Sequence, residues 1–139
     1  MGLAVTLLIG GVILAIALLH LSWAFGSDWP TPKGRLAVYV TAGTRRPGTA
    51  ITVAVAAAIA LAGVIVLILR APLAWPWNML SSAAYFGVML VFLARGMAGY
   101  FPALWRACEG RPFHRLNRIY YSPLCLVIAG GLAANLLLT

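Results

Sequence analysis

Hydrophobic residues fall into four long runs, separated by connections that hold most of the charge. The runs cover residues 2–25, 49–69, 78–101 and 119–138. Each run is close to the roughly 20 residues that an α-helix needs to cross about 30 Å of hydrocarbon. The pattern therefore predicts an all-α integral membrane protein, in which residues 1–139 form a single four-helix bundle.

The first run is interpreted as a mature transmembrane helix and not as a secretory signal. It has no basic segment ahead of it, and it is longer than the hydrophobic region of a signal peptide. The connection at residues 70–77 is short. Because short connections join antiparallel neighbours, the second and third spans are predicted to form a hairpin.

Charge is distributed unequally between the two sides of the predicted bundle. Arg70 alone lies between the second and third spans, whereas nine of the ten basic residues lie in or beside the other two connections. These nine are Lys33, Arg35, Arg45, Arg46, Arg95, Arg106, Arg111, Arg115 and Arg118. Short basic loops stay in the cytoplasm. We therefore expect a protein of the cytoplasmic (inner) membrane with both termini extracytoplasmic.

Composition supports the membrane assignment and changes the meaning of the net charge. Hydrophobic residues make up 63% of the chain, charged residues 9%, and the mean hydropathy is +0.99, whereas a soluble domain is nearer half apolar and a quarter charged. The net charge of +8 would suggest nucleic acid in a soluble protein. In loops between membrane spans it indicates orientation and anionic lipid headgroups instead.

Small residues recur at helical spacing in two of the runs. The second run holds an alanine stripe (Ala50, Ala54, Ala58 and Ala62) with Gly63 beside its last member, and the fourth holds Gly130 and Ala134. Small residues at every fourth position let helix backbones approach closely in a membrane. Both patterns predict helix–helix contacts, within the chain or between copies of it.

Two ionisable residues lie inside the predicted spans at similar depth. His20 is about 9 Å from the end of the first span at the helical rise, and Arg95 is about as far from the end of the third. Trp23 shares a helix face with His20. Arginine can reach the headgroups from this depth, and a lone histidine often bonds a neighbouring carbonyl. An intramembrane charge also indicates a functional site.

The segment "RPFHRLNRIYYSP" at 111–123 is predicted to form a short interfacial amphipathic helix before the fourth span. One face carries apolar residues and the other carries His114, Asn117, Arg118 and Tyr121. Ser122 before Pro123 resembles an N-cap followed by the first residue of a helix. A helix N-terminus beside Arg118 and Arg95 would attract an anion.

These residues together predict a cytoplasm-facing pocket that binds an anionic amphiphile or lipid headgroup. The candidate binding residues are His20, Trp23, Asp28, Trp29, Arg95, Arg118, Tyr121 and Ser122. The arginines would supply charge, His20 and Tyr121 hydrogen bonds, and the tryptophans an apolar wall. In an alternative role, Arg95 forms an internal ion pair with Asp28 that holds the pocket shut.

Three other functions remain open. A membrane enzyme could use His20 or His114 as general base and a tyrosine as acid on a lipid-soluble substrate. Haem could be ligated by His20 and His114, although no cofactor is otherwise expected. A structural subunit, or a homo-oligomer, would use the alanine stripe as its interface. The chain has no metal, phosphate-loop or nucleophile motif, and its only acids are Asp28 and Glu109.

Short motifs at three helix ends resemble a known family. His20, Trp23, Gly26, Trp29 and Pro30 end the first run, Arg95-Gly96 and Gly99 end the third, and "YSP" at 121–123 opens the fourth. This combination is similar to small bacterial four-helix membrane proteins of the domain of unknown function 3995. The resemblance covers nearly the whole chain and implies a four-helix membrane fold. It implies no activity.

Overall fold

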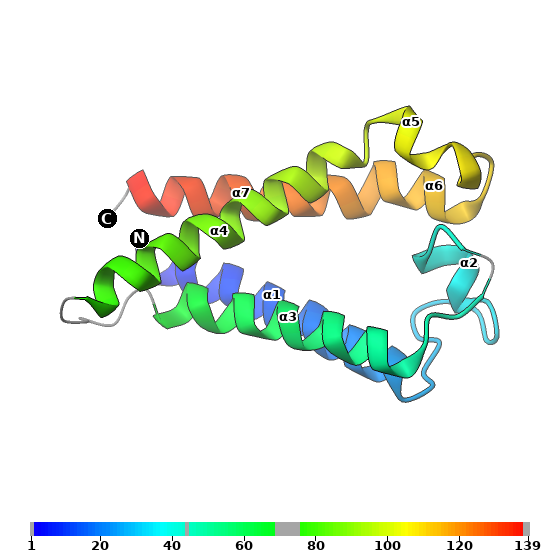
Figure 1. Cartoon of the computed structure of the whole chain (residues 1–139), viewed down its shortest axis with the longest axis horizontal. Helices are drawn as coiled ribbons and strands as arrows, with labels where there is room; N and C mark the ends of the chain where they lie inside the picture. The colour runs from blue at the N-terminus through cyan, green and yellow to red at the C-terminus, as the bar shows by residue number, and fades with distance from the viewer. Residues whose placement is uncertain (1, 44, 69–75, 138–139) are drawn as a thin grey trace.

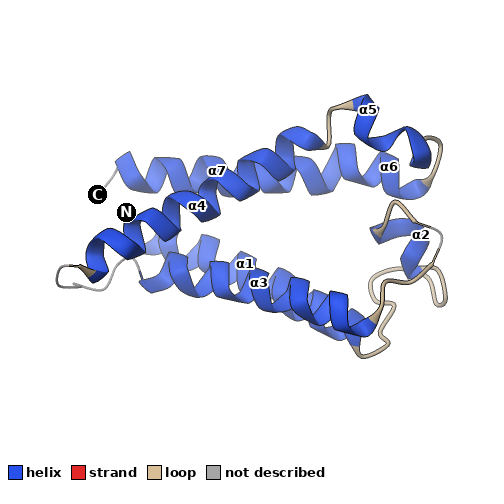
Figure 2. Ribbon diagram, viewed as in Figure 1, coloured by secondary structure: helices blue, strands red, loops and turns tan. Residues whose placement is uncertain are grey.

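The computed structural model describes residues 2–43, 45–68 and 76–137, and four long helices dominate it (Figures 1 and 2). They are α1 (Gly2–Ala24), α3 (Thr49–Ile68), α4 (Trp77–Ala98) and α7 (Ser122–Leu137). With the turns that precede α7, all four are long and apolar enough to cross a membrane. The predicted all-α four-span architecture is therefore confirmed. Arg70 and the predicted span ends at 69 and 138 lie outside the described residues.

The two ends of the bundle differ in content. Both chain termini lie at one end, the terminal end (Figure 1). The opposite end carries the short helices and the nine basic residues, and we call it the basic end. Its short elements are α2 (Leu36–Val40), α5 (Pro102–Trp105), the 3₁₀ turn η1 (Arg106–Cys108) and α6 (Pro112–Leu116).

Backbone conformation explains why α1 and α4 end where they do at the basic end. Gly26 follows α1 with φ +99°, a left-handed conformation that glycine adopts without a Cβ penalty and that commonly terminates helices. α4 stops before Pro102, and the preceding Phe101 is extended at φ −85° and ψ 105°, because proline disfavours helical geometry in the residue before it. Loops at the basic end therefore begin where the sequence breaks the helices.

The helices pack as two antiparallel pairs, α1 with α3 and α4 with α7 (Figure 1). α3 and α4 are in contact as the predicted hairpin requires, but α1 is the main partner of α3. Close approach at Gly63 explains the pairing, since a Cβ there would lie 2.9 Å from Leu14 Cδ2. Side-chain fit, and not the length of the connection, determines which helices pack most extensively.

The predicted small-residue contact on α3 is present at its Gly63 end and wrong for three alanines of the stripe. Ala50, Ala54 and Ala58 are exposed, whereas Ala62 is partly buried against the core. The buried face of α3 holds Thr52, Ala56, Gly63 and Val66.

The small-residue prediction in α7 is wrong in the same way. Gly130 and Ala134 are exposed, and an added Cβ at Gly130 would meet nothing within 4 Å. The neighbouring Gly131 is the position that contacts α1, because a Cβ there would lie 2.7 Å from Ile9 Cδ1. Helical spacing was correctly recognised in both helices, but the register of the contact was not.

Apolar side chains and a buried polar network hold the terminal end together. Ile13, Val66 and Leu132 are fully buried between the two helix pairs. The Tyr85 hydroxyl donates to the Leu132 carbonyl at 3.0 Å, and the Asn135 amide donates to Thr6 Oγ1 at 3.0 Å and to the Tyr85 oxygen at 3.2 Å. These bonds satisfy polar groups that would be costly to leave unpaired in a membrane.

The fourth helix runs without a break from α6 through η2 (Asn117–Tyr121), a π-helical turn, into α7. The predicted amphipathic segment is therefore the first part of this helix and not a separate element. Ser122 is helical, with its N–H donating to the Asn117 carbonyl, so its prediction as an N-cap is wrong. Pro123 explains the wide turn, because its ring clashes with the carbonyl four residues earlier. No helix N-terminus is left there to bind an anion.

Candidate functional site

A cavity of about 390 Å³ lies between the two helix pairs, towards the basic end. Polar and aromatic groups from three helices line it: His20 and Trp23 of α1, Arg95 of α4, and Tyr121 of η2. Its other walls are Ile16, Val40, Val55, Ala58, Ile59, Ala62, Val91, Phe92, Phe113, Leu124 and Cys125. This central cavity thus combines a mainly apolar interior with one cationic residue.

Arg95 is the charged residue of the central cavity. Its Nη2 donates to Asn117 Oδ1 at 2.8 Å, and its Cζ lies 5.7 Å from the centroid of the Trp105 ring. Nη1 is buried and has no hydrogen-bond partner. A cation over an indole face is stabilised by the ring quadrupole, but this contact satisfies no N–H. Arg95 therefore retains an unmet donor.

Asn117 is fully buried beside Arg95, and it too has a side-chain donor without a hydrogen-bond partner. Its Oδ1 accepts from Arg95 and, at 3.4 Å, from the Ser122 hydroxyl, whereas Nδ2 has no partner. Arginine can only donate, so the oxygen of the amide must face it and the NH₂ group must face away. Asn117 falls on the polar face of the predicted amphipathic segment, where no role was expected for it. The Pro123 two turns later, which widens the helix at Asn117, was the available signal.

His20 faces the central cavity from α1 and is held by its own helix. Its Nδ1 lies 2.8 Å from the Ile16 carbonyl, and its ring centroid is 4.8 Å from that of Trp23. A carbonyl can only accept, so Nδ1 carries a proton and, in the neutral ring, Nε2 is an acceptor. The predicted proximity of His20 and Arg95 is present as a shared cavity.

Tyr121 connects the cavity wall to the segment around α2. Its hydroxyl donates to the Tyr39 carbonyl at 3.0 Å. Arg111 Nη1 donates to the Ala42 carbonyl at 3.0 Å. The segment around α2 is thereby attached to the α4–α7 pair across the basic end.

Asp28 and Trp29 lie outside the central cavity. Asp28 forms a salt bridge with Arg46 at 3.1 Å and accepts from the Gly34 N–H at 2.7 Å. The alternative ion pair between Asp28 and Arg95 is therefore wrong. The Trp29 side chain is 71% exposed, and the residue contributes its carbonyl to Trp23 Nε1 at 2.7 Å. Both residues shape the loop that follows α1.

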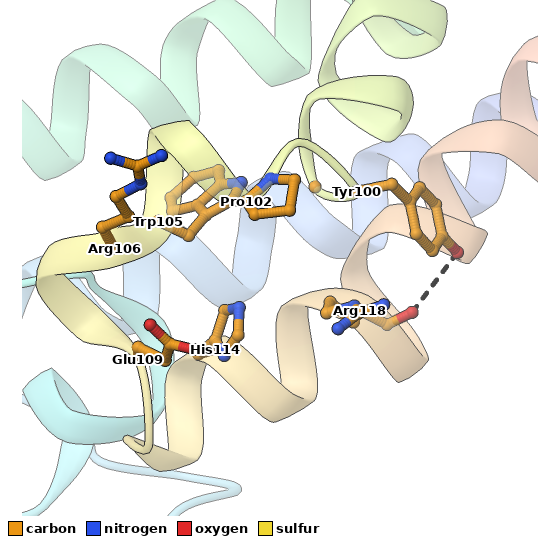
Figure 3. Close-up of a pocket in the computed structure, with 8 residues that line it drawn as sticks. Tyr100, Pro102, Trp105, Arg106, Glu109, His114 and Arg118 are labelled. Carbon is orange, nitrogen blue, oxygen red and sulfur yellow. Dashed lines mark hydrogen bonds between the residues drawn. The ribbon is translucent and has the colours of Figure 1, made fainter.

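Arg118 lines a second, smaller pocket of about 170 Å³ (Figure 3). Glu109 and His114 also line this pocket, and Figure 3 shows the Tyr100 hydroxyl donating to the Arg118 carbonyl, a bond of 3.3 Å. His114 thus lies in a different pocket from His20. Haem ligation by the two histidines stays a prediction, and within the described residues no group of three His, Cys, Asp or Glu side chains gathers as a metal site.

Ser122 is fully buried at the crossing of α4 and α7, and not in either pocket. A Cβ on Gly99 would overlap its hydroxyl and lie 2.7 Å from its Cβ. The hydroxyl faces Asn117 Oδ1. Ser122 therefore positions Asn117, and of the eight predicted site residues four line the central cavity.

Four membrane-crossing helices around a cavity with one cationic wall define a small all-α polytopic membrane protein. The chain belongs to the family described as Protein of unknown function (DUF3995), which matches residues 13–132 and confirms the resemblance found in the sequence. No curated protein and no solved structure matches the chain significantly. The matched range contains all of the central cavity but omits Thr6 and Asn135 of the terminal end.

Proposed function

We propose that the protein binds an anionic amphiphile in the central cavity, with a carboxylate or phosphate oxygen at Arg95. The observation that carries the proposal is a buried donor without an acceptor, Nη1 of Arg95, on the charged residue of the cavity wall. A buried donor left unpaired costs about 1 to 3 kcal/mol. An oxyanion has several lone pairs and would recover part of that cost.

Charge and lining favour an anion with an apolar tail. In the described part of the chain, neither carboxylate forms a salt bridge with Arg95, because Asp28 pairs with Arg46 and Glu109 lines the second pocket. Most of the central cavity wall is aliphatic or aromatic. Because Arg95 Nη1 is covered, binding requires the guanidinium to turn towards the cavity that the side chain already lines.

We also propose that the basic end faces the cytoplasm. Nine of the ten basic residues lie there, and short basic loops resist translocation. Anionic lipids are enriched in the cytoplasmic leaflet, and they would place such ligands beside Arg95. A C-terminal alkaline phosphatase fusion should be active and a C-terminal fluorescent protein dark. The reverse pattern would overturn this orientation.

The binding proposal is tested with cis-parinaric acid, a fluorescent fatty acid, in nanodiscs of zwitterionic phosphatidylcholine. Energy transfer from tryptophan reports binding, and Trp23 lies in the cavity wall. Arg95→Lys should weaken binding by about tenfold or more, equal to about 1.4 kcal/mol, because lysine cannot grip an oxyanion in two places.

Arg115→Lys is the matched control, since Arg115 is exposed at the same end and does not line the central cavity. It should bind like the wild type. Equal binding by Arg95→Lys and wild type, or a wild type that does not bind, would contradict the proposal.

A further inference from the structure

Three lining residues of the central cavity are also exposed on the outside of the bundle, where α3 and α4 diverge. Val55 is 41% and Val91 66% exposed, and Ala58 is exposed as well. Val55 lies six residues into α3, about 9 Å from its start, so this surface faces hydrocarbon and not water. On the α1–α7 side, the exposed lining residue is Leu124, at 40%.

The water-facing side of the cavity is covered by the segment around α2. Val40 lines the cavity, and the Tyr121–Tyr39 and Arg111–Ala42 hydrogen bonds attach this segment to the opposite helix pair. The preceding loop is held by Arg46, which donates to Asp28 and to two backbone carbonyls at the end of α1. An amphiphile that enters from the membrane side therefore has to break fewer polar contacts than one that enters from the water-facing side.

The volume of the cavity limits the number of chains it accepts. Its 390 Å³ is about 13 times the roughly 30 Å³ that one water molecule occupies in the liquid. A methylene group is of similar size. A space on this scale suits one acyl or isoprenoid chain of about a dozen carbons better than two parallel chains.

We infer that the ligand is a single-chain amphiphile with a compact oxyanion, and that it enters from the bilayer between α3 and α4, past Ala58 and Val91. This inference rests on the proposed function. The headgroup slides along the α3–α4 opening until it reaches Arg95, and the chain stays in the apolar part of the cavity. Carboxylates and phosphate monoesters share the required chemistry.

Chain number is tested on the wild type by displacing cis-parinaric acid. Lysophosphatidic acid and phosphatidic acid carry the same phosphate but one and two chains. The one-chain competitor should displace the probe at a concentration lower by about tenfold or more. Equal displacement would overturn the single-chain inference while leaving the proposed function intact. A wild type that does not bind the probe defeats both.

The route is tested by the rate of probe association in a stopped-flow experiment. Ala58→Trp should slow association by about tenfold or more, within the range over which rates vary among variants of one site. Ala54→Trp, one turn away, exposed and outside the cavity lining, should leave the rate unchanged. Because Val91 is already two-thirds exposed, Val91→Trp repeats the test if Ala58→Trp fails to fold. Slowing by Leu124→Trp alone would put the entrance between α1 and α7 and overturn this route.

Discussion

The terminal end and the basic end both bury an asparagine of the fourth helix, but only one of the two amides is fully used. Asn135 Nδ2 contacts Thr6 and Tyr85. Asn117 Nδ2 contacts no acceptor, and Arg95 beside it also retains a buried donor. Thr6, Tyr85 and Asn135 form a closed network between three helices, whereas Asn117 is bonded to Arg95, which lines the central cavity.

This difference separates the structural role of the terminal end from the ligand-binding role that we propose for the basic end. Matched polar groups inside a membrane hold helices together, by about 0.6 kcal/mol per hydrogen bond on average. Unmatched donors weaken the fold unless something else provides an acceptor. The terminal end is therefore the structural anchor of the bundle, and the basic end holds the proposed ligand site, where buried donors lack acceptors.

The largest effect is expected from a substitution that forces α4 and α7 apart at the basic end. Gly99→Ala adds a Cβ that overlaps Ser122, so α4 and α7 must separate, at a cost of about 3 kcal/mol or more in unfolding free energy. Gly87→Ala in the same helix is the control, because a Cβ there meets nothing within 4 Å. Thermal unfolding in detergent measures both. Equal melting temperatures would mean that the crossing is not closely packed.

A smaller loss of stability is expected when the hydrogen-bond network of Thr6, Tyr85 and Asn135 is disrupted. Asn135→Leu removes the donor to Thr6 and Tyr85 and should lower the unfolding free energy by about 1 to 2 kcal/mol. Binding of cis-parinaric acid should be unchanged once the variant is folded. A selective loss of binding without loss of stability would reverse the roles assigned to the two ends.

Asn117→Asp tests the comparison between the two ends, because it places a carboxylate of the chain itself beside the unpaired donor of Arg95. A carboxylate at Arg95 would pair with the guanidinium, so stability should stay within about 1 kcal/mol of the wild type or rise. Binding of the fatty acid should fall by about tenfold or more. Asn78→Asp, exposed at the far end of α4, makes the same charge change and should bind normally. Unimpaired binding by Asn117→Asp would show that Arg95 does not receive the headgroup.

The smallest effect is expected at the exposed ion pair. Asp28 and Arg46 side chains are 17% and 39% exposed, so Asp28→Asn should cost less than about 1 kcal/mol. The loss should shrink further in high salt. A salt-independent loss of several kcal/mol would mean that Asp28 balances a buried charge after all.

Much of the architecture could be predicted because hydrophobic length and charge act over whole segments. Four spans and the concentration of charge at one end follow from run lengths and the positions of Lys and Arg. The equal depth of His20 and Arg95 predicted that they would lie close together, and both line the central cavity.

Features that depend on helix rotation could not be predicted in this way. The alanine stripe and Gly130 have the spacing of a contact surface, yet most of these positions are exposed, and α1 packs on Gly63 beside the stripe and on Gly131 next to Gly130. Asn117 points inward because Pro123 forces a π turn, so its role required knowledge of backbone geometry. Asp28 pairs with Arg46 because the loop after α1 folds back on itself, a contact that no periodicity reveals.

Native mass spectrometry with membrane lipids retained tests the central claim most directly. We predict an added mass of a single-chain anionic amphiphile on the wild-type protein, retained on Arg115→Lys and reduced or lost on Arg95→Lys. A wild-type protein that carries no such mass, or an anionic adduct equally abundant on Arg95→Lys, would contradict the claim that Arg95 and the central cavity form the binding site.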